Sequence, residues 1–453
     1  MTRPLATDDL LLPGLALGPD RVALHEEGAD TSYIGLQNDI NHVVAQLAAR
    51  GLRPGNRVAI VLPAGRFMMA MLLGALRAGA LVTVLSMTLG PAARQRRLDN
   101  FQPDLVITEA DHLKQAAPFP TPTTAGGRLV LWTSGSTGNS RGIVLEWEGL
   151  LWNARANAAT LGLQPDDRAL VLLDGAYCYA LVHQMLSHIA VGASVAIPRQ
   201  PAWLEATGRF IDRWQPTTLA VVPSILKALL ALPRLRAQLR RLRMITVGGA
   251  PIDEPLMRHA QVTMPDTQLV ITYGLTEAGP RVCTRVTDAN GEAQQGDVGY
   301  PLPGVEVRVA EDGELFVRSP SARVATLEDG VVMDAPPWVP TGDLGMVDAT
   351  GRVRILGRKR SMINRGGAKL SPGEIEQVLE THPGVARARV VAAPHSRLGE
   401  VAKAFVLLRD GGGPSTSELA QLCLEQLGAP WVPASIEFVA DTATFPRSWK
   451  EAP

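Results

Sequence analysis

Short apolar runs alternate with helix-like patterns along the chain up to about residue 300. The runs have the length and composition of buried strands. Between the first two, residues 66–78 show the apolar spacing of a helix that ends at Gly79. Strands separated by helices are typical of parallel sheets covered on both faces, so the pattern predicts an α/β fold. The predicted strands are RVAIVLP (57–63), VTVLS (82–86), DLVITE (104–109), RLVLW (128–132), TLAVVP (218–223), MITV (244–247) and QLVITY (268–273).

The pattern changes beyond about residue 300. Residues 305–319 and 346–357 each read as two short strands around a turn, which predicts β-hairpins. Further on, Ser371-Pro372-Gly373-Glu374 has the order of an N-cap, a first-turn proline and a capping-box glutamate, and predicts a helix start. We therefore expect a large domain over residues 1–357, β-rich from about residue 300, and a small mobile α+β domain over 358–453.

Charge and cysteine content narrow the function classes. The 453 residues contain 44 Lys plus Arg and 44 Asp plus Glu, so no global field attracts nucleic acid or an anionic membrane. The three cysteines are far apart and lack metal-ligand spacing, which favours a reducing compartment. No signal-peptide pattern occurs, and the apolar stretch 67–87 reads as a buried helix followed by a strand. We expect a cytoplasmic protein with no nucleic-acid or membrane partner.

A Ser/Gly-rich segment directly follows the predicted strand 128–132. Its glycines let the backbone approach an oxyanion, and its hydroxyls and N–H groups supply donors. The Gly-Lys-Ser/Thr ending of a Walker A loop is missing, and a flexible connector is the other interpretation. The candidate phosphate-binding residues are Thr133, Ser134, Gly135, Ser136, Thr137 and Gly138.

A second polar segment, Thr272-Tyr273-Gly274-Leu275-Thr276-Glu277, ends the predicted strand 268–273. Ligands bind at the carboxyl ends of parallel strands, so these side chains are well placed. Tyr273 could stack on a base, Thr276 could bind phosphate and Glu277 could hold Mg²⁺. A capped turn without a ligand is the alternative.

Three further segments supply candidate residues. Asp343, in the sequence Thr341-Gly342-Asp343, is expected in a loop that enters a hairpin, where it could accept two ribose hydroxyls or simply serve the turn. Arg358 could contact a ribose or phosphate, although basic runs are usually solvated. The segment Gly366-Gly367-Ala368-Lys369 indicates a close approach of backbone to a ligand or neighbouring chain segment.

The order of these segments resembles the adenylate-forming superfamily, which includes acyl-CoA synthetases, non-ribosomal peptide synthetase adenylation domains and luciferases. The resemblance covers nearly the whole chain. The matching segments are TSGSTGNSRG (133–142) for the phosphate loop, VGGAP (247–251) for the adenine-side strand, TYGLTE (272–277), TGD (341–343), and GRKRSMINRGGAKLSPGEIE (357–376) for the start of the mobile domain.

The resemblance implies an ATP-dependent ligase. An acid carboxylate attacks the α-phosphate of MgATP, and the acyl-adenylate then passes its acyl group to coenzyme A or to the phosphopantetheine of a separate carrier protein. Thr276, Glu277 and Lys450 would be catalytic, with Glu277 on the metal. The residues implied for the nucleotide are the 133–138 loop, Arg141, Gly249, Ala250, Thr272, Tyr273, Gly274, Asp343 and Arg358, and those implied for the hinge and acceptor are Arg360, Gly366, Gly367 and Lys369.

The chain departs from the superfamily's pattern at three of these positions. The phosphate loop continues Ser140-Arg141-Gly142 where Pro-Lys-Gly is usual, and Arg360 stands at the hinge in place of Asp or Lys. In the tail, Lys450 lies two positions closer to Pro446 than the usual catalytic lysine, and Trp449 precedes it in place of Gly. We still expect Lys450 to be that lysine.

The acid pocket favours a substrate without an α-amine. Amino-acid-activating members place an aspartate where the alignment puts Tyr177, and a phenol cannot neutralise an ammonium. Asp174 lies three residues away, so a stand-alone amino-acid adenylation enzyme stays an alternative, as does a degenerate nucleotide-binding protein. We expect an aryl or short acyl acid, with Arg281 available to a polar substituent. The predicted pocket residues are Tyr177, Tyr179, Val222, Gly248 and Arg281.

Overall fold

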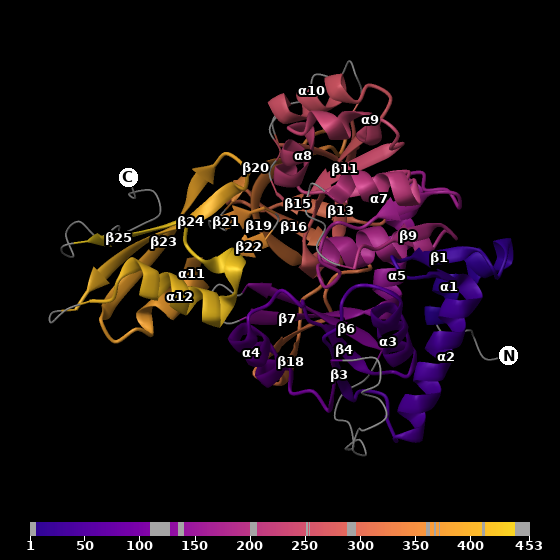
Figure 1. The fold of residues 1–453 in the computed structure, drawn as a ribbon, viewed down its shortest axis with the longest axis horizontal. Coiled ribbons are helices and arrows are strands. Elements are labelled where there is room, and N and C mark those ends of the chain that lie inside the picture. Colours follow the sequence, from indigo (N-terminus) through magenta and orange to yellow (C-terminus); the bar gives the residue numbers. More distant parts are fainter. Residues whose placement is uncertain are drawn as a thin grey trace.

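The computed structural model folds into three β-sheets flanked by helices (Figure 1). Two sheets lie within residues 6–358, and the third belongs to residues 363–439, hereafter the C-terminal region, drawn in yellow at one side of Figure 1. The structure describes residues 6–108, 127–134, 140–199, 206–250, 252, 254–287, 296–358, 363–366, 368–370, 372–409 and 413–439.

Of the strands in these ranges, seven form the first sheet, in the order β18-β17-β7-β6-β4-β3-β5. The strands are β3 (Arg57–Ile60), β4 (Leu81–Val84), β5 (Leu105–Ile107), β6 (Arg128–Ser134), β7 (Ser140–Glu146), β17 (Ala325–Glu328) and β18 (Val331–Asp334). Parallel pairing joins β5, β3, β4 and β6. The flanking helices are α2 (Tyr33–Ala49), α3 (Arg66–Arg77) and α4 (Pro91–Phe101). The predicted helix and strands are confirmed here.

The second sheet has thirteen strands within the described residues, in the order β15-β16-β19-β20-β14-β13-β12-β11-β10-β8-β9-β1-β2. Its strands are β1 (Val22–His25), β2 (Asp30–Ser32), β8 (Arg168–Leu170), β9 (Ser194–Ala196), β10 (Thr218–Val221), β11 (Met244–Gly248), β12 (Gln268–Gly274), β13 (Arg281–Val286), β14 (Asp297–Pro301), β15 (Glu306–Val309), β16 (Glu314–Arg318), β19 (Val339–Val347) and β20 (Val353–Arg358). Strands β1 and β8 to β12 pair in parallel, which confirms the predicted α/β class.

Helices cover the second sheet, and two of them, η2 and η5, also border the cavity described below. They are α1 (Ala6–Leu17), α5 (Trp147–Thr160), the π-helix η2 (Tyr179–Leu186), α6 (Ser187–Ile189), α7 (Thr207–Trp214), α8 (Pro223–Leu230), η4 (Pro233–Leu235), α9 (Arg236–Leu239), α10 (Glu254–Thr263) and the 3₁₀ turn η5 (Thr276–Ala278). Apolar side chains of α8, α10 and β10 to β12 share one buried cluster, so helices and strands form a common core.

Both predicted hairpins are present, as β15–β16 and β19–β20. The expectation that Asp343 lies in a loop was wrong, because Thr341–Asp343 belongs to strand β19. The backbone of Gly342 has φ +70°, and the β19 register shifts between Leu344 and Gly345, so the strand bulges here instead of ending. Asp343 consequently stands opposite Arg358 on β20.

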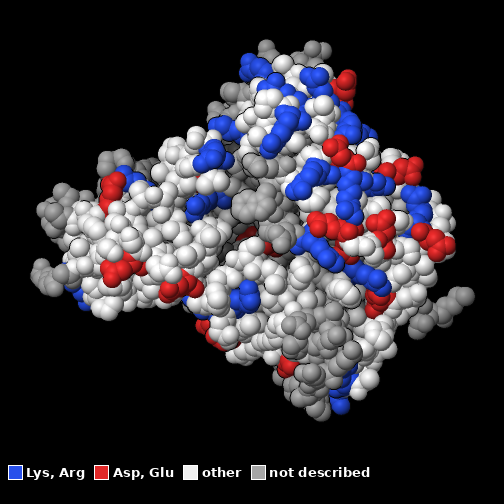
Figure 2. Space-filling view, viewed as in Figure 1, with Lys and Arg blue, Asp and Glu red and all other residues white. Residues whose placement is uncertain are grey.

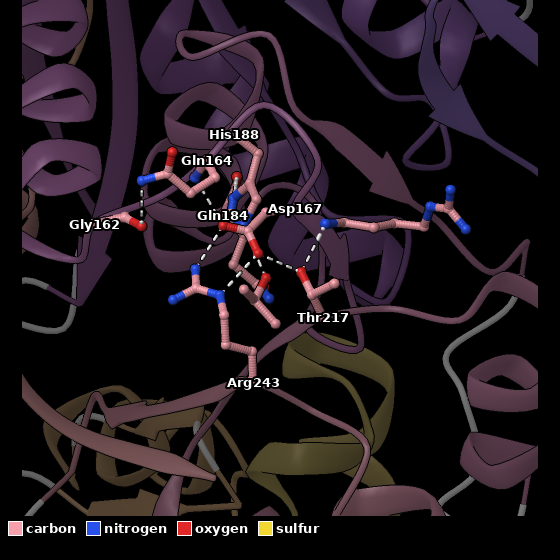
Figure 3. Close-up of polar contacts among 9 residues, drawn as sticks. Gly162, Gln164, Asp167, Gln184, His188, Thr217 and Arg243 are labelled. Carbon is pink, nitrogen blue, oxygen red and sulfur yellow. Dashed lines mark hydrogen bonds and ion pairs between the residues drawn. The ribbon is translucent and has the colours of Figure 1, made fainter. Parts of the chain in front are cut away.

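A polar network around the buried Asp167 ties the amino ends of the parallel strands together (Figure 3). Asp167, just before β8, accepts hydrogen bonds from Thr217 Oγ1 (2.6 Å), just before β10, and from Arg243 Nη2 (2.5 Å), just before β11. Burial opposes ionisation of this carboxyl, but the donors lower the pKa of Asp167 overall. The network therefore holds the amino ends of these strands in place. The predicted binding segments lie at the opposite, carboxyl ends.

The C-terminal region has its own sheet and core. Its elements are β21 (Ile363–Arg365), β22 (Ala368–Leu370), α11 (Pro372–Glu380), β23 (Val385–His395), β24 (Gly399–Leu408), α12 (Thr416–Leu427), η6 (Ala429–Trp431) and β25 (Ser435–Val439). Ser415 and Glu418 form a capping box that starts α12. The predicted capping serine of α11, Ser371, lies outside the described residues. The division of domains at residue 358 stays a prediction.

The surface carries both signs of charge on the face shown in Figure 2. Basic side chains gather over α8 to α10, where Arg234, Arg236, Arg240 and Arg241 are exposed. Within the described ranges, no helix combines the length and apolar character that crossing a bilayer requires.

Candidate active site

A cavity of about 500 Å³ lies where the carboxyl ends of strands from both larger sheets meet the C-terminal region. Its wall includes Thr133 on β6, Thr276 and Glu277 between β12 and β13, and Gly366 and Trp431 from the C-terminal region. Carboxyl ends of parallel strands are where α/β folds bind ligands. Three separate predicted segments therefore border one cavity.

The connection between β12 and β13 holds Thr276 and Glu277 on the wall. The Leu275 N–H donates to the Pro280 carbonyl oxygen at 3.0 Å and closes the loop. Gly274 permits this approach, because a Cβ there would lie 2.0 Å from the same oxygen. The Arg323 N–H donates to the Glu277 carbonyl oxygen at 2.8 Å. These backbone bonds hold the two candidate catalytic side chains in fixed positions.

Tyr273 and Asp343 are brought together from segments 70 residues apart. The Tyr273 hydroxyl donates to Asp343 Oδ2 at 2.7 Å, and Asp343 is 4% exposed. Burial, and then the negative charge of Asp343, raise the pKa of Tyr273 well above its usual value. Thr341, beside Asp343, also lines the cavity. The Arg358 side chain lies outside the described part of the structure.

The predicted phosphate loop is only partly described. Thr133 lines the cavity, and Ser134 ends β6, but residues 135–139 (Gly135, Ser136, Thr137, Gly138 and Asn139) lie outside the described residues. Arg141 stands opposite Thr133 on β7, and its guanidinium forms an exposed ion pair with Glu328. The role predicted for Arg141 toward phosphate stays a prediction.

Tyr177 and Tyr179 line another part of the cavity wall. The Tyr179 hydroxyl lies 3.2 Å from Oγ1 of both Thr246 and Thr272. Strand β11 ends beside these residues at Gly248. A side chain does not fit at this position, because a Cβ on Gly248 would lie 2.2 Å from Thr272 Oγ1.

Gly249 lines the cavity beside these tyrosines and has φ +80°. A Cβ there would lie 2.9 Å from the Tyr177 hydroxyl and 3.4 Å from Val222 Cγ1. Val222 is fully buried behind this position. The next residue, Ala250, is only partly buried.

Arg281 is a buried cation on the cavity wall, 3% exposed. Its Nε donates to Asn157 Oδ1 at 3.2 Å, its Nη2 lies 2.5 Å from His183 Nδ1, and its guanidinium carbon lies 5.4 Å from the Tyr179 ring centroid. Burial lowers the pKa of Arg281, and burial together with the Arg281 charge lowers the pKa of His183 well below its usual value. His183 is therefore neutral.

Two polar residues at or beside the cavity, His183 and Arg97, give no signal in the sequence. His183 lies in the apolar run ALVHQML, where a single histidine reads as core. Asp174 lines the cavity, and its carboxylate accepts hydrogen bonds from the Ser86 hydroxyl and from the Ala176 N–H at 2.8 Å. Arg97, on α4, also lines the wall, and its guanidinium carbon lies 6.0 Å from the Trp132 ring centroid.

The C-terminal region forms one wall of the cavity through Gly366, Ala368, Leu427 and Trp431. It contacts the rest of the chain through α12, which packs against α4, and Arg96 Nη2 donates to the Gln426 carbonyl oxygen at 3.0 Å. Lys369 lies on β22, but its side chain is outside the described part. Arg360, Gly367 and Lys450 also lie outside the described residues, so their predicted roles stay predictions.

Glu277 fits a magnesium ion that shares its coordination with a substrate. Among the described residues, no group of three or more His, Cys, Asp or Glu side chains could hold a metal ion. Mg²⁺ is commonly held by one or two carboxylates together with substrate phosphates and water, which a single cavity carboxylate satisfies.

Comparison with known proteins finds matches along most of the chain. Residues 15–322 match the family described as AMP-binding enzyme, and residues 374–448 match the one described as AMP-binding enzyme C-terminal domain. The fatty acid–[acyl-carrier-protein] ligase ScoC of Streptomyces coeruleorubidus is 30% identical, over 93% of this chain and 90% of that protein. A Mycobacterium tuberculosis CoA ligase for a methyl-dioxo-octahydroindenyl propanoate is 34% identical over 68% of this chain, and the match spans 62% of that relative's length.

The fold also matches solved structures. A double mutant of the o-succinylbenzoate CoA synthetase of Bacillus subtilis, bound to a product analogue, aligns with a TM-score of 0.83. The alignment covers 98% of this chain and 96% of that chain at 23% sequence identity. This likeness shows that the two chains share a fold.

Proposed function

Because the chain belongs to the AMP-binding enzyme family, we propose that it activates a carboxylic acid with ATP and transfers the acyl group to a thiol. The family match confirms the predicted membership of the adenylate-forming superfamily. Relatives that include CoA ligases and an acyl-carrier-protein ligase support the predicted class, an AMP-forming acid–thiol ligase.

The reaction has two steps. First, a carboxylate oxygen of the acid attacks the α-phosphorus of ATP, the bond from that phosphorus to the bridging oxygen breaks, and pyrophosphate leaves. Then a thiolate sulfur attacks the acyl carbon, the carbon–oxygen bond to AMP breaks, and AMP leaves. Catalysis of both steps depends mainly on positioning and on compensating charge at the phosphates.

The convergence of Thr133, Thr276 and Glu277 on one cavity supports this proposal most. Tyr273 and Asp343 do not line the cavity themselves, but their neighbours Thr272, Gly274 and Thr341 do. Thr133 and Thr276 supply hydroxyl donors to phosphate oxygens, and Asp343 accepts the ribose hydroxyls. Magnesium, when bound at Glu277, neutralises phosphate charge. Lys450 contacts the reacting carboxylate and α-phosphate in the first step.

The acid substrate lacks an α-amine in this proposal. Tyr177 stands where an ammonium would need a carboxylate, and the buried guanidinium of Arg281 borders the same cavity and would repel an ammonium. Asp174 is the observation that favours the alternative, an amino-acid adenylation enzyme. Its carboxylate already accepts hydrogen bonds from Ser86 and Ala176, which leaves it less available to a substrate amine.

Coenzyme A or the phosphopantetheine of a separate carrier protein is the proposed acceptor. The wall formed by Gly366, Ala368 and Trp431 supports a thiol entry route along the C-terminal region. We also propose a cytoplasmic location, since the three cysteines form no disulfide among the described residues.

An ATP–pyrophosphate exchange screen across benzoates, short fatty acids, longer acyl acids and amino acids tests the proposal. Exchange with an acid that lacks an α-amine, followed by thioester formation with coenzyme A or a carrier protein, is the expected result. Exchange restricted to amino acids supports the amino-acid adenylation alternative. ATP binding without exchange for any acid indicates a degenerate nucleotide-binding protein.

A further inference from the structure

Arg281 lies in the cavity wall, and the described residues give it no acidic partner. Its side-chain partners among the described residues are neutral: the Asn157 amide, the His183 ring and the Tyr179 ring. Among the described residues, no Asp or Glu carboxylate forms an ion pair with Arg281. A buried cation is normally paired, because removal from water is costly without a counter-charge.

The same strand provides a matched comparison. Arg285 on β13 is also buried, with a side-chain exposure of 5%, and its Nη1 lies 3.1 Å from Oδ2 of Asp297, whose side chain is 4% exposed. Arg285, which does not line the cavity, is therefore paired with the Asp297 carboxylate. Arg281, which does line it, has neutral side-chain partners among the described residues.

The backbone and the side chain of Arg281 make separate sets of contacts. The backbone of Arg281 already fastens β13 to α5, because Asn153 Oδ1 accepts from its N–H at 3.1 Å and Asn153 Nδ2 donates to its carbonyl oxygen at 3.0 Å. The guanidinium adds contacts to Asn157 of α5 and His183 of η2. These elements are distinct from β6, η5 and β19, which carry several candidate nucleotide residues, and Arg281 itself lies opposite Gly274 of β12.

We propose that Arg281 receives a second acidic group on the substrate, so that the enzyme activates one carboxyl of a dicarboxylic acid. This inference rests on the proposed function and specifies its substrate class. A guanidinium binds a carboxylate through two parallel N–H donors, and the neutral His183 accepts from the side not used by the substrate. The substrate carboxylate then supplies the negative charge that the described residues do not provide to Arg281.

Matched acid pairs in the ATP–pyrophosphate exchange assay test the proposal. Hexanoate is compared with adipate, and 3-phenylpropanoate with its ring-carboxylated derivative, for the wild type, Arg281→Gln and Arg281→Lys. The wild type is expected to prefer the diacid in at least one pair. Arg281→Gln should lower kcat/KM for the diacid by about 10- to 100-fold more than for the monoacid, the range of a lost charge-assisted hydrogen bond. Arg281→Lys should restore part of the preference.

A second readout separates this inference from the proposed function. The melting temperature of each variant is measured with and without the diacids. The diacid should stabilise the wild type and Arg281→Lys more than Arg281→Gln, whether or not exchange occurs. If no acid supports exchange, the proposed function fails while this binding result still decides the role of Arg281. A wild type that prefers the monoacids, or an equal loss on both members of each pair, overturns the inference.

Discussion

The Tyr273 hydroxyl donates a 2.7 Å hydrogen bond to the Asp343 carboxylate and joins β12 to β19 beside the cavity. Two residues predicted to contact opposite parts of the nucleotide, the base and the ribose, are thus part of one hydrogen-bonded unit. A substitution of either residue should therefore affect the other. Substitutions at this pair can thus separate effects on protein stability from effects on nucleotide binding.

Removing the hydroxyl in Tyr273→Phe leaves the buried Asp343 with one donor fewer. We expect a loss of about 1–2 kcal/mol in the free energy of unfolding, the usual cost of removing one partner of a buried hydrogen bond. Urea unfolding measures it. Tyr300→Phe is the control, because the Tyr300 hydroxyl lies 3.4 Å from Thr350 Oγ1 at an exposed site. Equal stability of the two variants would contradict the importance of the pair.

Asp343→Ala should weaken ATP binding, since the carboxylate is the proposed acceptor for ribose hydroxyls. Losing such hydrogen bonds should raise the ATP dissociation constant about tenfold or more. Calorimetry with a non-hydrolysable ATP analogue measures the effect, and a correctly folded variant is checked by its melting curve. Asp334→Ala, at the exposed end of β18, is the control. Unaltered ATP affinity in Asp343→Ala removes this residue from the ribose site.

Lys450→Ala should separate the two half-reactions. Loss of a cation at the developing phosphate charge is expected to lower ATP–pyrophosphate exchange by about 10²-fold or more. Thioester formation from a synthetic acyl-adenylate should continue, since that step needs no attack on ATP. Lys227→Ala on the exposed side of α8 serves as the control. Exchange at the wild-type rate would exclude Lys450 from the first step.

Gly249→Ala should affect the acid more than the nucleotide. The position has φ +80°, and the new Cβ would lie 2.9 Å from the Tyr177 hydroxyl, so the pocket narrows. Gly351→Ala is a matched control, with φ +86° and nothing within 4 Å of its Cβ. Both changes should cost about 1–2 kcal/mol of stability, the penalty of a left-handed alanine. Only Gly249→Ala should raise KM for the acid, and an equal KM in both variants would exclude a steric role.

His188 should make the fold sensitive to acid. Its buried ring donates from Nδ1–H to the Gln184 carbonyl oxygen at 2.7 Å, and its Nε2 lies 2.8 Å from Thr218 Oγ1. Burial lowers its pKa from 6.5 to about 4, with Asp167 and Arg243 as the nearest charges (Figure 3). The unfolded chain therefore binds the proton first, and stability should fall as the pH drops from about 6.5 to about 4.

Urea unfolding at pH 7.5 and pH 5 measures this dependence. His188→Gln should be less stable at pH 7.5 but lose less stability between the two values than the wild type. His42→Gln, at an exposed position on α2, should keep the wild-type dependence. A His188→Gln variant with the full wild-type loss would assign the acid sensitivity to other groups.

The sequence predicts those parts of the fold that local patterns encode. The hairpin over residues 305–319 has a turn flanked by two strand-like runs, and β15–β16 is confirmed. That segments 133–138 and 272–277 each lie at the carboxyl end of a strand could be predicted, although β6 and β12 belong to different sheets. The strand position of Asp343 could not, because the bulge at Gly342 depends on pairing with both β16 and β20.

The surroundings of Arg281 depend on contacts between distant segments. Its partners His183 and Asn157 lie 98 and 124 residues earlier in the chain, and neither has a neighbouring pattern that marks it. The sequence can indicate that Arg281 is near a pocket, but not that its surroundings are neutral. The contribution of Trp431 to the cavity is equally non-local, because it depends on how the C-terminal region packs against α4.

Residues from β6 and from the β21–β22 hairpin border the same cavity, so an acyl-adenylate held there is shielded from water only while the C-terminal region stays in place. A mixed anhydride is readily hydrolysed, so the predicted outward movement of that region would expose the intermediate. The rate at which free acid and AMP appear in the absence of a thiol acceptor therefore reports how often the enclosure opens.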